Sequence, residues 1–188
     1  MFYTGIGSRK TPEHIQLLMT VIAIKLDDNF TLRSGGADGA DTAFERGAIN
    51  KEIYLPFKGF NNNTSDLVVT NFPNFKEIED VARSIHPVFN NLSDKVKLFH
   101  TRNVCQVVGI DLSTPSNLVV CYTPDGANTA DKVNINTGGT GTAIKLASLM
   151  EIPILNMANK DDFNAIIDMV GKEAVSYTHL TLPTIYSV

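Results

Sequence analysis

Three glycine-rich turns lie along the chain, each beside a strand-like segment and each running into a helix-like one. Their sequences are TGIGSR (residues 4–9), RSGGADGAD (33–41) and TGGTGT (137–142). A strand that leads through a glycine turn into a helix is the repeating unit of a parallel α/β sheet, and such turns gather at the carboxyl ends of the strands. The chain is therefore predicted to form one α/β domain, with a Rossmann-like, doubly wound and mainly parallel sheet flanked by helices.

The hydrophobic pattern supplies the elements of this sheet. Strands are predicted at residues 2–4, 30–33, 51–55, 117–122 and 153–155. Helices are predicted from residue 12 to an end near 27–29, and at 40–48, 75–84, 93–108, 141–150 and 161–170. Thr11 is expected to cap the first helix with Pro12 in its first position, and Ser93 is expected to cap the fourth. Segments 57–73 and 123–137 are interpreted as loops, and loops of this length are usually functional or mobile.

The composition and charge of the chain limit the kinds of partner that it is expected to bind. The chain has 188 residues, a net charge of −4 and no apolar run near the roughly 18 residues that span a bilayer. No membrane association is expected, and a nucleic-acid partner is disfavoured because clustered Lys and Arg are missing. Cys105 and Cys121 are interpreted as reduced, buried thiols of a cytoplasmic protein. His14, His86 and His100 are too far apart, with too few acidic or thiol companions, to predict a metal site.

The last fourteen residues, VSYTHLTLPTIYSV (175–188), differ from the rest of the chain because they contain no Lys, Arg, Asp or Glu. Their first ten residues also match one reading frame of a common transposon sequencing adapter. Our hypothesis is that residues 1–174 form the domain and residues 175–188 are a non-native tail. The alternative is a genuine β-prone C-terminal segment, and codons that differ from the adapter throughout would decide for it.

Each glycine turn has the features of a phosphate-binding site, which we call a phosphate seat. Glycine lets the backbone approach a phosphate closely, and the helix that follows offers free N–H groups and a partial positive charge. Glycine also serves plain tight turns, so three turns together are a stronger indication than one. The triphosphate loop GxxxxGK[ST] is missing, and Lys10 stands where the GxGxxG fingerprint needs its third glycine. We expect a small nucleotide-derived ligand and no cofactor.

Six segments, in this order, give the turns a wider context: GIGSRKTP, LRSGGADGADTAFERGA, KEIYLPFKGFN, HTRN, CYTPDG and GGTGTAIKLA. As a set they resemble the SLOG superfamily of Rossmann-like proteins, which includes Smf/DprA proteins and LOG-type nucleotide phosphoribohydrolases. The chain is most similar to small SLOG proteins often carried by bacteriophages, and the resemblance covers nearly all of residues 1–172. It implies a homo-oligomer in the cytoplasm, that of the bacterial host if a phage encodes the chain.

One position departs from the hydrolase pattern. LOG-type hydrolases carry a PGGxGTxxE motif, and the corresponding stretch here is TGGTGTAIK (137–145). Thr137 replaces the proline, and Lys145 replaces the glutamate that the resemblance implies is catalytic. A lysine cannot accept a proton or support an oxocarbenium-like ribose as a carboxylate would. No catalytic residue is therefore predicted, although the phosphate seat is kept.

The candidate ligand-binding residues lie in these motifs. They are Gly5, Gly7, Ser8, Arg9, Arg33, Ser34, Gly35, Gly36, Asp38, Gly39, Asp41, Arg102, Asn103, Asp125, Gly138, Gly139, Thr140, Gly141 and Thr142. Arg9 and Arg33 are candidate phosphate clamps, with a solvated or structural role as the alternative. Arg102 and Asn103 are assigned by the resemblance alone.

The three aspartates among these candidates each have two interpretations. Asp38 and Asp41 are candidates for binding ribose hydroxyls, and the alternative is that they cap the second helix. Asp125 is a candidate for contacting a base or a ribose, and the alternative is an ordinary turn residue.

Three functions follow from these residues. The first is non-catalytic binding of an ADP-ribose derivative or a cyclic nucleotide, as a phage sponge that sequesters a bacterial immune signal. The second is a phosphoribohydrolase or N-glycosidase that uses Asp38, Asp41 or Asp125 as its carboxylate. The third is a DprA-like binder of single-stranded DNA, which the acidic charge and the lack of a basic, aromatic-rich stripe disfavour.

Overall fold

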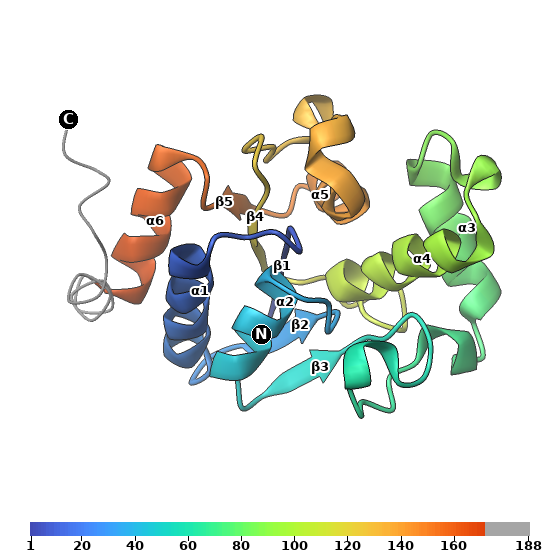
Figure 1. Ribbon diagram of the computed structural model, residues 1–188, viewed down its shortest axis with the longest axis horizontal. Coiled ribbons are helices and arrows are strands. Elements are labelled where there is room, and N and C mark those ends of the chain that lie inside the picture. Colours follow the sequence, from blue (N-terminus) through green and yellow to red (C-terminus); the bar gives the residue numbers. More distant parts are fainter. Residues whose placement is uncertain (172–188) are drawn as a thin grey trace.

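The chain forms one five-stranded sheet in which every strand is parallel to its neighbours (Figure 1). The computed structural model describes residues 1–171, so the predicted limit at 174/175 and the tail 175–188 lie outside the described residues. The strands are β1 (Phe2–Gly7), β2 (Thr31–Ser34), β3 (Lys51–Ile53), β4 (Leu118–Tyr122) and β5 (Ile154–Asn156). Their order in the sheet is β3-β2-β1-β4-β5. The predicted Rossmann-like α/β fold is confirmed.

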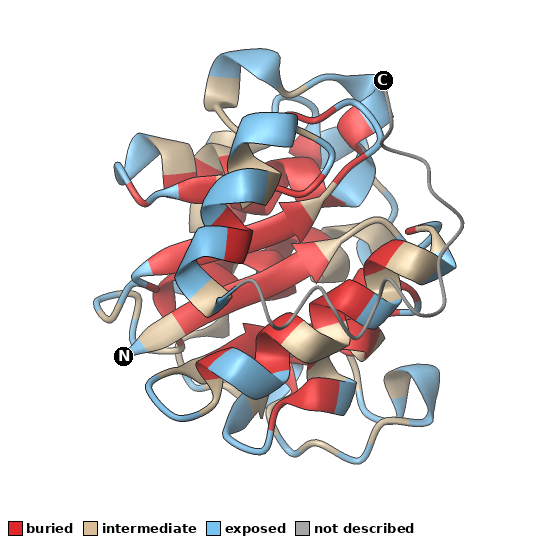
Figure 2. Cartoon of the chain, turned by 90° about the vertical axis from the view of Figure 1, so that its left-hand side faces the viewer, coloured by how far each residue is buried: buried red, intermediate tan, exposed pale blue. Residues whose placement is uncertain are grey.

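Six helices flank this sheet. They are α1 (Glu13–Leu26), α2 (Ala40–Gly47), α3 (Phe75–Ile85), α4 (Asp94–Val108), α5 (Gly141–Leu149) and α6 (Lys160–Val170). Helices α1, α2 and α6 pack into one hydrophobic core, and α3, α4 and α5 pack into a second core. Figure 2 shows the buried strands enclosed by these helices. Among residues 1–171, no helix has both the length and the apolarity needed to cross a membrane.

Strand β4 shows why the sheet is buried on both faces. Leu118 and Val120 belong to the first core, whereas Val119 and Cys121 belong to the second. Successive side chains of a strand point to opposite faces, so a continuous apolar run such as LVVCY is the pattern of a central strand covered on both sides. The two cysteines, Cys105 and Cys121, are free and buried in the second core.

The start of α1 differs from the prediction. The helix begins at Glu13, and Pro12 occupies the N-cap position that was predicted for Thr11. Thr11 instead donates from both its backbone nitrogen and its hydroxyl to the carbonyl of Ser8, at 3.2 and 2.6 Å. The hydroxyl therefore closes the first glycine turn rather than the helix. The predicted cap of α4 at Ser93 is correct in position.

The two predicted loops contain short helical turns. Segment 57–73 holds two 3-10 turns, η1 (Phe60–Asn62) and η2 (Val69–Asn71), and Leu55 forms a parallel bridge with Val68. Segment 123–137 holds η4 (Ala130–Lys132) and runs into η5 (Ile135–Thr140). The second of these segments therefore delivers the third glycine turn directly to the start of α5.

Candidate functional site

The chain order reverses between β1 and β4, and this point fixes where a ligand is expected. From β1 the chain builds outward through β2 to β3, and it then returns to the other side of β1 to build β4 and β5. In open parallel sheets, ligands bind beyond the carboxyl ends of the strands at such a switch point. At this point Gly7 and Tyr122 are paired, and the next residue, Ser8, donates its N–H to the Tyr122 carbonyl at 2.9 Å.

The first and second glycine turns are packed against each other here. The carbonyl of Ser8 accepts from the N–H of Ala40 at 3.3 Å. Gly39 has a φ of +79°, and a Cβ on it would lie 2.5 Å from the Ser8 carbonyl oxygen. A Cβ on Gly7 would lie 2.6 Å from the Tyr122 carbonyl oxygen. Gly7 and Gly39 are therefore required by the close approach of backbone to backbone, whether or not a ligand is bound.

Helix α4 supports the third glycine turn. Asn103 donates its side-chain N–H to the Gly139 carbonyl at 2.8 Å, and the ring Nδ1 of His100 lies 2.7 Å from the Thr142 hydroxyl. Both contacts join one face of α4 to one short turn. Asn103 therefore positions the turn, and its amide is already used in doing so.

Asp125 supports the same turn from the other side. Its carboxylate accepts from the Thr137 hydroxyl at 2.5 Å and from the Asn134 side-chain amide at 3.0 Å. Partial desolvation raises the pKa of Asp125, but the hydrogen bonds from Thr137 and Thr123 outweigh it and leave the pKa lowered. Asp125 is thus ionised, and its hydrogen bonds hold the loop that precedes α5 in place.

The backbone of the third turn is open at its middle. Gly138 and Gly139 are exposed, and no heavy atom of residues 1–171 lies within 4 Å of a Cβ built on either. Gly138 has a φ of +65°, which favours glycine. Helix α5 begins two residues later, and within the described chain its N-cap Thr140 makes no side-chain capping bond. The Gly141 N–H donates to the Gly138 carbonyl, and the other N–H groups at such a helix start are a place for an anion. Gly141 differs, because a Cβ there would lie 2.7 Å from Val133.

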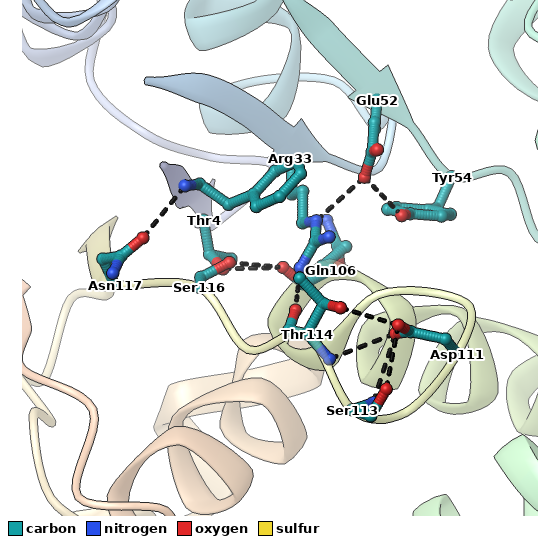
Figure 3. A network of polar contacts seen from close by, with 11 residues as sticks. Thr4, Arg33, Glu52, Tyr54, Gln106, Asp111, Ser113, Thr114, Ser116 and Asn117 are labelled. Carbon is teal, nitrogen blue, oxygen red and sulfur yellow. Dashed lines mark hydrogen bonds and ion pairs between the residues drawn. The ribbon is translucent and has the colours of Figure 1, made fainter. Parts of the chain in front are cut away.

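Arg33 is not a phosphate clamp, and this prediction is corrected (Figure 3). Its Nε pairs with Glu52 at 2.8 Å, and a terminal nitrogen donates to the Thr114 carbonyl. Its guanidinium also lies 3.7 Å from the centre of the Phe2 ring. Phe2 begins β1 and Thr114 precedes β4, so the side chain extends toward the amino ends of the strands, away from the glycine turns. Arg33 therefore has the structural role that was the alternative to a phosphate clamp.

Gly5 and Ser34 also have structural roles inside the sheet. A Cβ on Gly5 would lie 2.7 Å from both Leu32 and Phe44, so the glycine lets α2 pack closely on β1. The Ser34 hydroxyl donates to the Gly5 carbonyl at 2.6 Å and is fully buried. Gly5 has no side chain to offer a ligand, and the Ser34 hydroxyl is already used inside the sheet.

Arg102 and Asp41 form a buried ion pair beneath the second turn. The two side chains are 3.2 Å apart, and Asp41 also accepts from the Ala37 N–H at 3.4 Å. A Cβ on Gly35 would fall 1.5 Å from the Arg102 guanidinium, which explains the glycine. Burial raises the pKa of Asp41, and the Arg102 charge opposes this shift. Both side chains therefore hold the second turn in place through these contacts, rather than contacting a ligand.

Two candidates remain exposed at the turns. Arg9 lies at the end of the first turn and forms no ion pair with any described residue. Asp38 lies in the second turn and accepts from the Asn61 side chain at 3.0 Å. The same amide of Asn61 donates to the Gly36 carbonyl at 3.0 Å. Asn61 was not among the predicted site residues, since nothing in its spacing links it to a turn 25 residues earlier.

A pair of histidines lies beside the third turn, in contrast to the expectation that they are far apart. The rings of His86 and His100 are 4.3 Å apart between centres. Burial, His86 and Arg102 lower the pKa of His100 to about 4, and burial and Lys145 lower the pKa of His86. Of the two rings, His86 is the one on which the Lys145 charge acts. Among residues 1–171, no group of three or more His, Cys, Asp or Glu side chains is arranged to hold a metal ion.

The neutral state of His100 predicts a pH-dependent stability. Because its pKa is about 4 when folded and 6.5 when unfolded, the unfolded chain takes up a proton first as the pH falls. The free energy of unfolding should therefore decrease below the unfolded pKa and level off below the folded one. We expect a loss of about 2 kcal/mol between about pH 7.5 and about pH 5, measured by urea unfolding. His100→Gln should reduce this loss and His14→Gln should retain it; equal losses in both would contradict the assignment.

Two hollows lie away from the turns. One of about 270 Å³ is bordered by Arg83, His86 and Phe89 at the end of α3. The other, of about 350 Å³, is bordered by Glu45, Lys51 and Asn63 beside the edge strand β3. Arg83 is tied to Glu79 at 2.9 Å, and Asn63 is tied to Glu45 at 3.0 Å. Neither hollow includes a residue of the three turns, which remain the candidate site.

Comparison with protein-family models, with curated proteins and with solved structures gives no match for this chain. The fold and the site define it as a parallel α/β protein of Rossmann-like architecture. The first and second glycine turns are packed together beyond the carboxyl ends of β1 and β2, and the open third turn is connected to the second through α4, where Arg102 contacts the second turn and Asn103 contacts the third.

Proposed function

We propose that the chain binds a small nucleotide-derived ligand over the three glycine turns and does not cleave it. The observation that carries this proposal is the exposed backbone of Gly138 and Gly139 at the start of α5, held from below by Asn103. A phosphate fits such a place because the free N–H groups at a helix start attract an anion and glycine leaves room for it. Exposed Arg9 at the neighbouring turn adds a positive charge.

The residues around this seat favour binding over cleavage. Lys145 stands one turn into α5, where related hydrolases place a glutamate according to the resemblance. Asp41 is paired with Arg102, and Asp125 is occupied by Thr137 and Asn134. The lowered pKa of Asp125 makes its carboxylate a weak proton acceptor, and the Asp41 carboxylate is buried and already paired with a cation. The ligand is therefore retained intact, as a sponge for an immune signal such as an ADP-ribose derivative or a cyclic nucleotide requires.

The proposal is tested by identifying what the protein holds. Purified protein is heated to release small molecules, which are analysed by mass spectrometry, and it is titrated calorimetrically with AMP, ADP-ribose and 3′,5′-cyclic AMP. We expect an unaltered nucleotide in the released fraction and binding of at least one compound. Failure to bind any of them, together with an empty released fraction, would overturn the proposal.

A substitution in the open turn locates the site. Gly139→Val places an isopropyl group where the seat is open, so affinity should fall by at least about tenfold. Thr70→Val places the same side chain at an exposed position in η2 and should leave affinity unchanged. Equal affinity in the two variants would show that the ligand does not bind at the third turn. Thermal unfolding of both variants shows whether the fold is retained.

One observation favours a second candidate, a phosphoribohydrolase. Asp38 is exposed in the second turn, and within the described chain its carboxylate accepts one side-chain hydrogen bond, from Asn61. It is the one of the three predicted aspartates whose carboxylate faces solvent without a guanidinium or hydroxyl donor. Release of free base from AMP by the wild-type chain, lost in Asp38→Asn, would favour this function over binding.

A further inference from the structure

Three phenylalanines form a half-buried aromatic group next to the turns. Phe57 and Phe60 come from the segment after β3, and Phe99 comes from α4. Their ring centres are 5.5 Å apart for Phe57–Phe60, 6.3 Å for Phe57–Phe99 and 5.4 Å for Phe60–Phe99. All three pairs meet edge to face, so no ring of the group is stacked flat on another. Each ring also remains partly exposed to solvent.

The group is held between the second and third turns. On one side, Phe60 is followed by Asn61, whose amide donates to the Gly36 carbonyl and to Asp38. On the other side, Phe99 precedes His100 and lies one helical turn before Asn103 on the same face of α4. Both residues contact the third turn, at Thr142 and Gly139. The aromatic rings are thus adjacent in sequence to the contacts that hold both turns.

The surroundings of the rings are suited to a planar polar ring. Asn61 and Asn62 both have left-handed backbone, with φ of 53° and 57°, and both are exposed beside Phe60. Among the described contacts, the Asn62 amide has no partner, so it is free to bond the edge of a ligand. Lys95 places its ammonium 5.5 Å from the centre of the Phe57 ring. Phe60 is also packed against the first hydrophobic core, which fixes the group to the fold.

We infer that Phe57, Phe60 and Phe99 form the subsite for the aromatic base of the ligand. This rests on the proposed function, which places the phosphate at Gly138 and Gly139. A nucleobase has a π-face for an aromatic ring and a polar edge for amides, whereas a sugar phosphate has neither. The ligand class is thereby narrowed to molecules that carry a base in addition to phosphate.

AMP and ribose 5-phosphate test this inference, because they share the ribose and a phosphate and differ in the base. Calorimetric titration of the wild-type chain should give a dissociation constant for AMP about tenfold or more below that for ribose 5-phosphate. Phe99→Leu should weaken AMP binding about tenfold and leave ribose 5-phosphate unchanged. Phe75→Leu, a half-buried phenylalanine of α3, is the matched control and should bind both as the wild type does.

A fluorescent nucleotide provides a measurement that does not depend on the folding of a variant. 2-Aminopurine riboside 5′-monophosphate is quenched when its base stacks, so its emission should fall on binding to the wild-type chain. Equal wild-type affinity for AMP and ribose 5-phosphate, or binding without quenching, would overturn the base subsite and leave the phosphate seat in place. Failure to bind AMP, ADP-ribose and ribose 5-phosphate alike would overturn the seat and the subsite together.

Discussion

Arg102→Met is expected to lower the free energy of unfolding by about 3–5 kcal/mol, the largest loss among the substitutions considered. Arg102 is 5% exposed and Asp41 is 3% exposed, so removal of the guanidinium leaves a carboxylate in the interior without its cation. The Ala37 N–H, at 3.4 Å, compensates little of that loss. Urea unfolding near neutral pH, with a constant slope against denaturant, measures the change.

Two controls separate the buried charge from other effects. Asp41→Leu combined with Arg102→Met removes both charges, and this double variant should be much more stable than Arg102→Met alone because no unpaired ion remains. Arg83→Met breaks a pair with Glu79 that is 38% and 18% exposed and should cost about 1 kcal/mol or less. A loss below about 1 kcal/mol for Arg102→Met would show that Asp41 is not held as a buried ion.

This ion pair also connects stability to the site. The guanidinium occupies the space beside Gly35, and Asp41 accepts from Ala37 in the same turn. Loss of the pair is therefore expected to disturb the second turn first, and with it the bond from Asn61 to Gly36 that fixes the aromatic group. Arg102 acts as a positioning residue for the proposed ligand.

The sheet could be predicted because its determinants are local. Glycine turns followed by helical periodicity, and the continuous apolar run LVVCY, gave the strands and helices within one to three residues at most ends. The N-terminal cap at Thr11 failed because its hydroxyl donates to the Ser8 carbonyl instead of accepting from an N–H of α1, a choice that spacing does not decide. The open third turn was likewise predictable, since its glycines are contiguous in the chain.

The roles of the charged residues could not be predicted, because their partners are distant in sequence. Arg33 and Thr114 are 81 residues apart, and Asp41 and Arg102 are 61 residues apart. Whether an arginine after a strand points to the carboxyl or the amino edge depends on what packs over it. The aromatic group depends in the same way on a loop that folds back to α4.

Lys145→Glu is expected to convert the proposed binding site into a slow hydrolase. Side chains on a helix lean toward its N-terminus, so residue 145 extends toward the open turn at Gly138 and Gly139. A glutamate there can accept a proton from water and stabilise positive charge on the ribose, as the lysine cannot. The wild-type chain should release no free base from AMP, and the variant should release it about 10²-fold above background, measured by chromatography of adenine.

The matched control for this change is Lys145→Gln, which removes the positive charge without adding a carboxylate and should stay inert. Because Lys145 lowers the pKa of His86, both variants should raise that pKa, and the glutamate more so. A His86 titration by NMR thus reports the local charge whether or not AMP is hydrolysed. One outcome would contradict this expectation: Lys145→Glu binds AMP and raises the His86 pKa as expected, yet releases no adenine. In that case the missing carboxylate does not explain the lack of hydrolysis, and the geometry of the site is that of a binding protein.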